Sequence, residues 1–142
     1  MEQWLIIIGA FIFGGLGTIH LVYTFFGTRL APYDANTITQ MKGSSLRLTK
    51  ETTVWKAWIG FNASHSLGAI IVAAVYIPLC ISHFEVLRQS IWLSLLPVFI
   101  GLSYLILAQR YWFRIPFIGI GISTVCFASA ALLLLMPKSI LI

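Results

Sequence analysis

Hydrophobic residues fill four long stretches of this chain, and the charged residues lie between them. The stretches without a charge cover residues 3–28, 57–84, 89–109 and 115–137. Each is long enough to supply the roughly 20 apolar residues that a helix needs to cross a bilayer. The pattern therefore predicts an all-α fold, an integral membrane four-helix transmembrane bundle of up-down-up-down topology. Its expected spans are residues 4–27, 54–80, 90–109 and 113–136.

The composition excludes an ordinary soluble domain. Of the 142 residues, 59% are hydrophobic and only 9% are charged, whereas soluble domains carry roughly 25% charged residues. So few charges cannot cover the surface of a compact protein in water. Because the spans and their connections fill the chain, we expect residues 1–142 to form a single transmembrane domain.

The basic residues are distributed unevenly, and their distribution predicts the orientation. The loops 29–56 and 110–114 share one face and carry most of the basic residues, which are Arg29, Lys42, Arg47, Lys50, Lys56, Arg110 and Arg114. The opposite face carries only Arg88 and Lys138. The positive-inside rule then predicts a multi-pass protein of the inner (plasma) membrane with both termini on the non-cytoplasmic side. Since topology accounts for the basic charge, we expect membrane lipids as partners and no nucleic acid.

The tryptophans and the loop residues support the same boundaries. Trp rings favour the headgroup level, and each lies at an expected span end: Trp4 and Trp92 outside, Trp55, Trp58 and Trp112 inside. In the first loop, Asp34 is expected to cap a short helix through Met41 that ends at Gly43, and Thr52 or Thr53 to cap the second span.

Small residues recur at four-residue spacing in the first two spans, a pattern that lets helices approach closely in lipid. The two stripes are Ala10, Gly14 and Thr18, and Gly60, Ser64 and Gly68. We expect them to pack the first span against the second, with a homo-oligomer through these helix faces as the alternative.

Polar side chains inside the spans are expensive in a bilayer and therefore mark the candidate chemistry. They gather in one layer, roughly 8–12 Å below the cytoplasmic boundary at about 1.5 Å per residue. The layer contains His20, Asn62, His65, Ser103, Tyr104 and Ser123. Tyr23 lies beside His20, and Arg110 and Arg114 lie just above the layer, within reach of the acidic group of a ligand.

Three functions of different classes fit this layer. The first is a pocket on the cytoplasmic side that binds a hydrophobic or amphipathic small molecule, with its turnover left open. There His20 and His65 are the candidate catalytic acid–base groups, and the candidate ligand-binding residues are Tyr23, Asn62, Ser64, Ser103, Tyr104, Arg110 and Arg114. The second is electron transfer by a b-type haem with His20 and His65 as axial ligands. The third is a non-catalytic subunit or scaffold, in which the polar residues serve as interhelical hydrogen-bond contacts.

A metal centre is not expected apart from haem iron, because no carboxylate lies inside a charge-free stretch. The run Trp55-Lys56-x5-Asn62-x2-His65 is similar to a second-helix segment of the MAPEG family of glutathione-dependent membrane enzymes, where an Asn-x-x-Glu motif occurs. Those enzymes are also four-helix proteins with a long cytoplasmic first loop. The resemblance implies a glutathione-dependent membrane enzyme, with His65 in the place of the family's glutamate and Lys56 as the matching basic residue.

Overall fold

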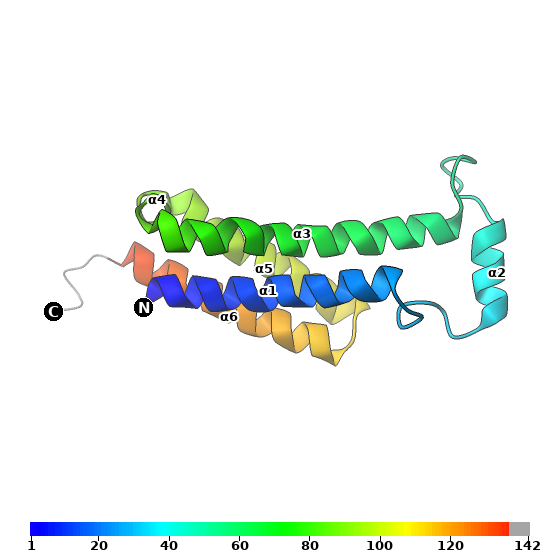
Figure 1. Cartoon of the computed structure of the whole chain (residues 1–142). Coiled ribbons are helices and arrows are strands. Elements are labelled where there is room, and N and C mark those ends of the chain that lie inside the picture. Colours follow the sequence, from blue (N-terminus) through cyan, green and yellow to red (C-terminus); the bar gives the residue numbers. More distant parts are fainter. Residues whose placement is uncertain (137–142) are drawn as a thin grey trace. The chain divides into compact units, whose positions relative to one another are not determined.

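The computed structural model describes residues 1–136, and within them the chain is helical without a strand. Four long helices match the predicted spans (Figure 1). The helices are α1 (Glu2–Phe25), α2 (Ala35–Gly43), α3 (Val54–Ser82), α4 (Phe84–Gln89), α5 (Ile91–Tyr111) and α6 (Arg114–Leu135). The predicted all-α membrane bundle is confirmed. Lys138, which entered the charge count, lies outside the described residues.

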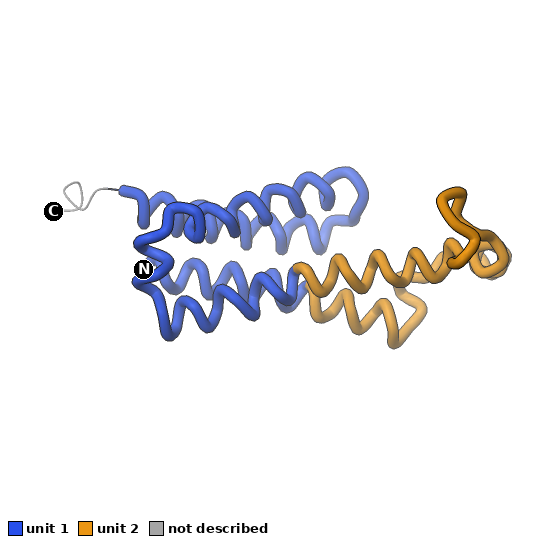
Figure 2. The backbone as a smooth tube through the Cα atoms, turned by 90° about the horizontal axis from the view of Figure 1, so that it is seen from above, with its two compact units in different colours: residues 1–16, 69–142 blue, residues 17–68 orange. Residues whose placement is uncertain are grey.

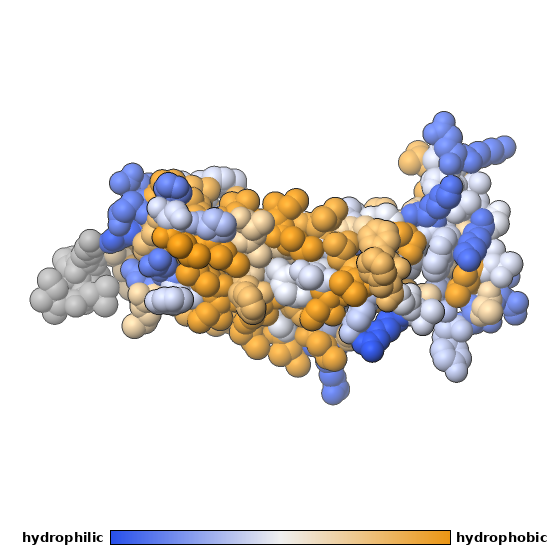
Figure 3. Space-filling model, viewed as in Figure 1, coloured by the Kyte–Doolittle hydropathy of each residue, from blue (hydrophilic) through white to orange (hydrophobic). Residues whose placement is uncertain are grey.

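The surfaces of the long helices face lipid. All four are long and apolar enough to cross a membrane, and each exposes large hydrophobic side chains, among them Phe11, Ile71, Phe99 and Val125. Apolar side chains cover much of the surface shown in Figure 3. A helix that is apolar on all sides is stable outside a protein core only in a bilayer. The chain is therefore a multi-pass membrane protein whose helices contact membrane lipids.

The chain divides into two compact units (Figure 2). Unit 1 consists of Met1–Leu16 together with the chain from Ala69 onward, and unit 2 consists of Gly17–Gly68. Unit 1 thus holds the first part of α1, the second part of α3 and the whole of α4, α5 and α6. Unit 2 holds the second part of α1, the whole of α2 and the first part of α3.

Aromatic rings fill the centre of unit 1. The ring of Phe13 on α1 meets the ring of Tyr104 on α5 edge-on, with centroids 5.0 Å apart. The Phe13 ring also packs against the ring of Phe127 on α6, with centroids 6.3 Å apart. Phe13 and Phe127 are fully buried, so α1, α5 and α6 share one apolar core.

Small residues let the helices of unit 1 approach closely. A Cβ built on Gly14 of α1 would lie 2.4 Å from the Cβ of Ala73 on α3. A Cβ on Gly101 of α5 would lie 2.7 Å from Thr124 Oγ1 on α6. No side chain larger than glycine fits at Gly14 or Gly101 without moving a neighbour. The predicted contact between the first two spans is confirmed at Gly14.

In the second stripe, the packing against the first span that the sequence predicted is not seen at Gly60 and Ser64. Gly60 and Ser64 are exposed, and no side chain lies near the position of a Cβ on Gly60. Depth along a helix is readable from sequence, but the direction a stripe faces is set by packing.

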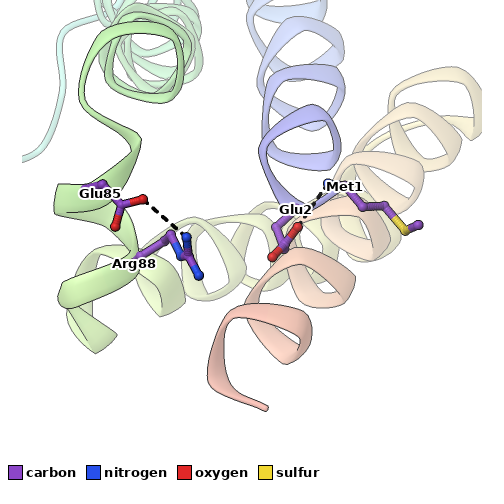
Figure 4. Close-up of polar contacts among 4 residues, drawn as sticks. All are labelled: Met1, Glu2, Glu85 and Arg88. Atoms are coloured by element: carbon purple, nitrogen blue, oxygen red, sulfur yellow. Dashed lines mark hydrogen bonds and ion pairs between the residues drawn. The ribbon is translucent and has the colours of Figure 1, made fainter. Parts of the chain in front are cut away.

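One end of unit 1 is closed by polar contacts and a helix that the sequence did not predict. Gln3 Nε2 donates to the carbonyl of Cys80 at 2.8 Å, which joins the start of α1 to the end of α3. The connection expected between the second and third spans contains α4, and Leu87 of this helix is fully buried. Figure 4 shows the ion pairs here, Met1 with Glu2 at 3.0 Å and Arg88 with Glu85 at 3.2 Å.

In unit 2, capping residues fix the long loop. Asp34 accepts hydrogen bonds from the backbone N–H groups of Asn36 and Thr37 and caps α2, as predicted. Thr53 Oγ1 accepts from Lys56 N at 3.3 Å and caps α3. Figure 1 shows α2 lying across the direction of α1 and α3.

The connection from α2 to α3 is closed at its base. Ser45 and Thr53 form an isolated antiparallel bridge, and Val54 N donates to the carbonyl of Ser44 at 2.9 Å. Residues 46–52 therefore form an excursion whose two ends are already paired.

Candidate functional site

Three of the predicted site residues come together in unit 2. His20 Nε2 on α1 lies 2.9 Å from Asn62 Oδ1 on α3. His65, one turn further along α3, meets the His20 ring edge-on with ring centroids 5.8 Å apart. We call His20, Asn62 and His65 the histidine site. Its two helices place an amide and two imidazoles within direct contact distance.

The hydrogen bonds of Asn62 determine which nitrogen of His20 carries a proton. Asn62 Nδ2 donates to the carbonyl of Trp58 at 2.8 Å, and only the amide NH2 can donate to a carbonyl. The Asn62 oxygen therefore faces His20, and an oxygen acceptor requires an N–H on His20 Nε2. In the neutral ring the basic nitrogen is then Nδ1. Asn62 thus selects the tautomer of His20 as well as holding its ring.

A second layer of contacts lies one helical turn closer to the loop. Trp58 Nε1 donates to the carbonyl of Leu30 at 3.2 Å. Arg29 donates to the Tyr23 hydroxyl, and its guanidinium lies over the Tyr23 ring, 4.6 Å from the centroid. Because Tyr23 is on α1 and Trp58 on α3, residues 29–30 are tied to both helices directly above the histidine site.

The histidine site lies deeper along α3 than Trp58 and is only partly covered. Asn62 follows Trp58 by one turn and His65 by two, so the two side chains are about 6 Å and 10 Å deeper than that indole. Trp rings mark the headgroup level. All three residues of the site are half-buried. Their sequence neighbours Ile19 and Phe61 are 52% and 78% exposed, so an apolar chain can lie against both helices beside the polar groups.

The other predicted residues of unit 2 use their polar groups elsewhere. Tyr23 binds Arg29, as described. Ser64 is exposed, and its hydroxyl donates to the carbonyls of Gly60 and Phe61 on its own helix. A ligand would have to compete with these backbone acceptors for the Ser64 hydroxyl.

The remaining predicted residues belong to unit 1. Ser103 is exposed and donates to the carbonyl of Phe99 at 2.8 Å. Tyr104 is half-buried and packs against Phe13. Arg110 and Arg114 are exposed where α5 ends and α6 begins. These four residues are described with unit 1, and His20, Asn62 and His65 with unit 2.

The ring geometry does not suit a haem between the two histidines. Axial ligation needs one nitrogen of each ring to point at a common iron, with the porphyrin between the rings. Instead the rings contact each other edge-on at 5.8 Å, and His20 Nε2 is directed at Asn62. Among residues 1–136, no group of three His, Cys, Asp or Glu side chains is arranged to hold a metal ion.

Comparison of the chain with known proteins finds no matching family model, no matching curated protein and no matching solved structure. The sequence did not single out Trp58 and Arg29 as parts of the candidate site. The signal for Trp58 was present, because it precedes Asn62 by four residues and so shares its helix face.

Proposed function

We propose that this chain is a plasma-membrane protein that binds a hydrophobic or amphipathic small molecule at the histidine site. The observation that supports it best is the meeting of His20, Asn62 and His65 from two helices. The proposal puts this meeting point in the hydrocarbon, since Trp58 lies nearer the loop. Such groups are costly in a bilayer and mark functional sites there. His65 adds a second imidazole beside the His20–Asn62 pair.

The site is suited to a ligand with a polar head and an apolar body. His20 can accept a hydrogen bond at Nδ1 when neutral and donate one there when protonated. His65 adds a second titratable ring beside it. The exposed Ile19 and Phe61 offer an apolar surface to the rest of the molecule. Turnover would use the same groups for proton transfer and is a further step beyond binding.

The proposal includes an orientation. The basic loops of unit 2 would face the cytoplasm and both termini the opposite side, as the positive-inside rule predicts. Cysteines introduced at Ser44 and Gln89 into a Cys80→Ala/Cys126→Ala chain test this. A membrane-impermeant thiol reagent should label the first only in inverted vesicles and the second only in right-side-out vesicles. The reverse pattern would place the site on the other side of the membrane.

The binding proposal is tested by the molecules that copurify with the protein. Lipids and other small molecules are extracted from purified wild type, His20→Ala, His65→Ala and Asn62→Leu, and are compared by mass spectrometry. We expect one species to be enriched in the wild type and lost in all three variants. His83→Ala is the matched control, because His83 is exposed and its side chain does not cap α4. If the same molecules copurify in the same amounts with the folded wild type and the folded variants, binding at this site is refuted.

The same preparations separate the alternatives. A Soret band lost in His20→Ala would establish haem and require a ring arrangement different from the one described. Saturable glutathione binding that needs Lys56 would favour the activity implied by the MAPEG resemblance. If the variants keep their fold and their protein partners, and the same small molecules copurify with them as with the wild type, the scaffold is favoured.

A further inference from the structure

Unit 2 carries an excess of positive charge around its loop. Its basic residues are Arg29, Lys42, Arg47, Lys50 and Lys56, and its acidic residues are Asp34 and Glu51. The Asp34 carboxylate is occupied by capping α2. Ion pairs within residues 1–136 occur at Met1–Glu2 and Glu85–Arg88, both in unit 1. No carboxylate of the described chain therefore neutralises Arg29.

Arg29 differs from the other four cations because it is held above the histidine site. Tyr23, to which it donates a hydrogen bond, follows His20 by three residues, which is about 4.5 Å along the helix axis. The guanidinium also stacks on the Tyr23 ring. The next residue, Leu30, is bound through its carbonyl to Trp58 on α3. These contacts fix the start of the loop, so the positive charge has a defined place relative to His20 and Asn62.

A guanidinium has five N–H donors in a planar fork that matches an oxyanion. One of its nitrogens is used by Tyr23, and the exposed side chain leaves the rest of the fork accessible. At the membrane surface the abundant oxyanions are the phosphates of lipid headgroups and the carboxylates of fatty acids. The spacing of about one helical turn places such an oxyanion directly above the polar groups of the histidine site.

We infer that Arg29 binds the oxyanion of an anionic amphipath, a phospholipid or a fatty acid, directly above His20 and Asn62. In a phospholipid the ester carbonyl below the phosphate then reaches these two residues. The apolar chain then lies along the exposed residues of α1 and α3. This inference rests on the proposed function, since it assigns the ligand class of the same site.

The experiment compares two anionic amphipaths with a neutral one. Protein is placed in phosphatidylcholine nanodiscs that contain phosphatidylglycerol, oleic acid or neutral diacylglycerol, and retained lipid is measured by native mass spectrometry. We expect both anionic ligands to be retained in preference to diacylglycerol. Arg29→Gln should weaken their retention on the order of tenfold to a hundredfold, the effect of losing charge-assisted hydrogen bonds, and leave diacylglycerol unchanged.

Arg47→Gln is the matched control, because it removes the same charge from an exposed position in the same loop. If Arg29→Gln and Arg47→Gln reduce the retention of anionic lipid equally, the effect is a general attraction to the basic loop and the inference is overturned. Equal retention of diacylglycerol and phosphatidylglycerol by the wild type also overturns it. Soluble glycerol phosphate is added as a competitor, and displacement of the lipid by it would identify a headgroup or free phosphate site without an amphipath.

Failure of the inference can be distinguished from failure of the proposed function. If His20→Ala and Asn62→Leu lose diacylglycerol while Arg29→Gln behaves as the control does, the site binds a neutral amphipath. The proposed function then stands and the ligand class is wrong. If His20→Ala and Asn62→Leu retain all three ligands as the wild type does, the histidine site is not a binding site.

Discussion

Gly14 gives the sharpest test of the packing in unit 1. A methyl group at Gly14 would lie 2.4 Å from the Ala73 Cβ, whereas carbon atoms in contact are about 3.5–4.0 Å apart. In Gly14→Ala, α1 and α3 would have to separate by about 1 Å or more at this point. Overpacking of this kind costs about 1–3 kcal/mol in the free energy of unfolding.

The adjacent glycine provides a control with the same chemical change. No atom lies within 4 Å of a Cβ built on Gly15. Alanine is a better helix former than glycine by up to about 1 kcal/mol, so Gly15→Ala should be neutral or slightly stabilising. Gly14→Ala should therefore be less stable than Gly15→Ala by about 1–3 kcal/mol.

A double variant tests whether the cost arises at the predicted contact. Gly14→Ala with Ala73→Gly moves one methyl group from α3 to α1 and restores the total volume. Its free energy of unfolding should return to about the wild-type value, because the helix propensities also cancel. The assay is reversible unfolding of the detergent-solubilised protein by SDS, followed by circular dichroism.

Two results would refute this reasoning. One is equal stability of Gly14→Ala and Gly15→Ala, which would mean that α1 and α3 do not meet at Gly14. The other is a double variant no more stable than Gly14→Ala, which would place the clash at a residue other than Ala73.

Three further predictions concern α4 and the loop of unit 2. Leu87→Ala should lower the free energy of unfolding by about 2–5 kcal/mol, because Leu87 is fully buried where α4 docks; SDS unfolding measures it. Hydrogen bonds from the Thr37 side chain and then from backbone N–H groups hold the pKa of Asp34 below its usual range. The stability of α2 should therefore be complete above the usual carboxyl pKa and be lost as the pH falls through the lowered value, as followed by amide NMR signals. Trp58→Phe removes the bond to Leu30, and limited proteolysis after Arg29 should become about 2- to 10-fold faster.

Each of these predictions has a conservative control. Val86→Ala, at an exposed position of α4, should have little effect, and equal losses at positions 86 and 87 would contradict the docking role. Asp34→Asn keeps an oxygen that can cap α2 but removes the carboxyl group that titrates. The helix should therefore remain capped, and its stability should no longer depend on pH in this range. Trp55→Phe should leave cleavage after Arg29 unchanged, because the Trp55 ring contacts Lys42 of α2.

The sequence was sufficient for the helices that have long or capped signals. Charge-free stretches of span length determined α1, α3, α5 and α6, and Asp34 with Gly43 determined α2. It was insufficient for α4, whose six residues are too few for a periodic pattern. That helix forms because Leu87 is buried against the bundle and Ser94 donates to its carbonyl at 2.8 Å, and such long-range support leaves no local signature.

The candidate site was predictable in depth but not in direction. Spacing along a helix places His20, Asn62 and Tyr104 at one level, since the rise per residue is fixed. Whether two residues at one level meet depends on the rotation of each helix, which packing decides. Within unit 2 His20 meets Asn62, and within unit 1 the Tyr104 ring packs against Phe13. Arg29 lies in a loop, where no periodic pattern predicts its contact with Tyr23.

The paired ends of residues 46–52 make this segment the natural place for changes of length. Ser45 and Thr53 already hold the ends of the excursion together, and lengthening a loop whose ends are fixed adds little closure entropy. An inserted epitope or a fused soluble domain would therefore leave α2 and the start of α3 in place. A small membrane protein that offers such a point can be enlarged for electron microscopy without a connection through either terminus.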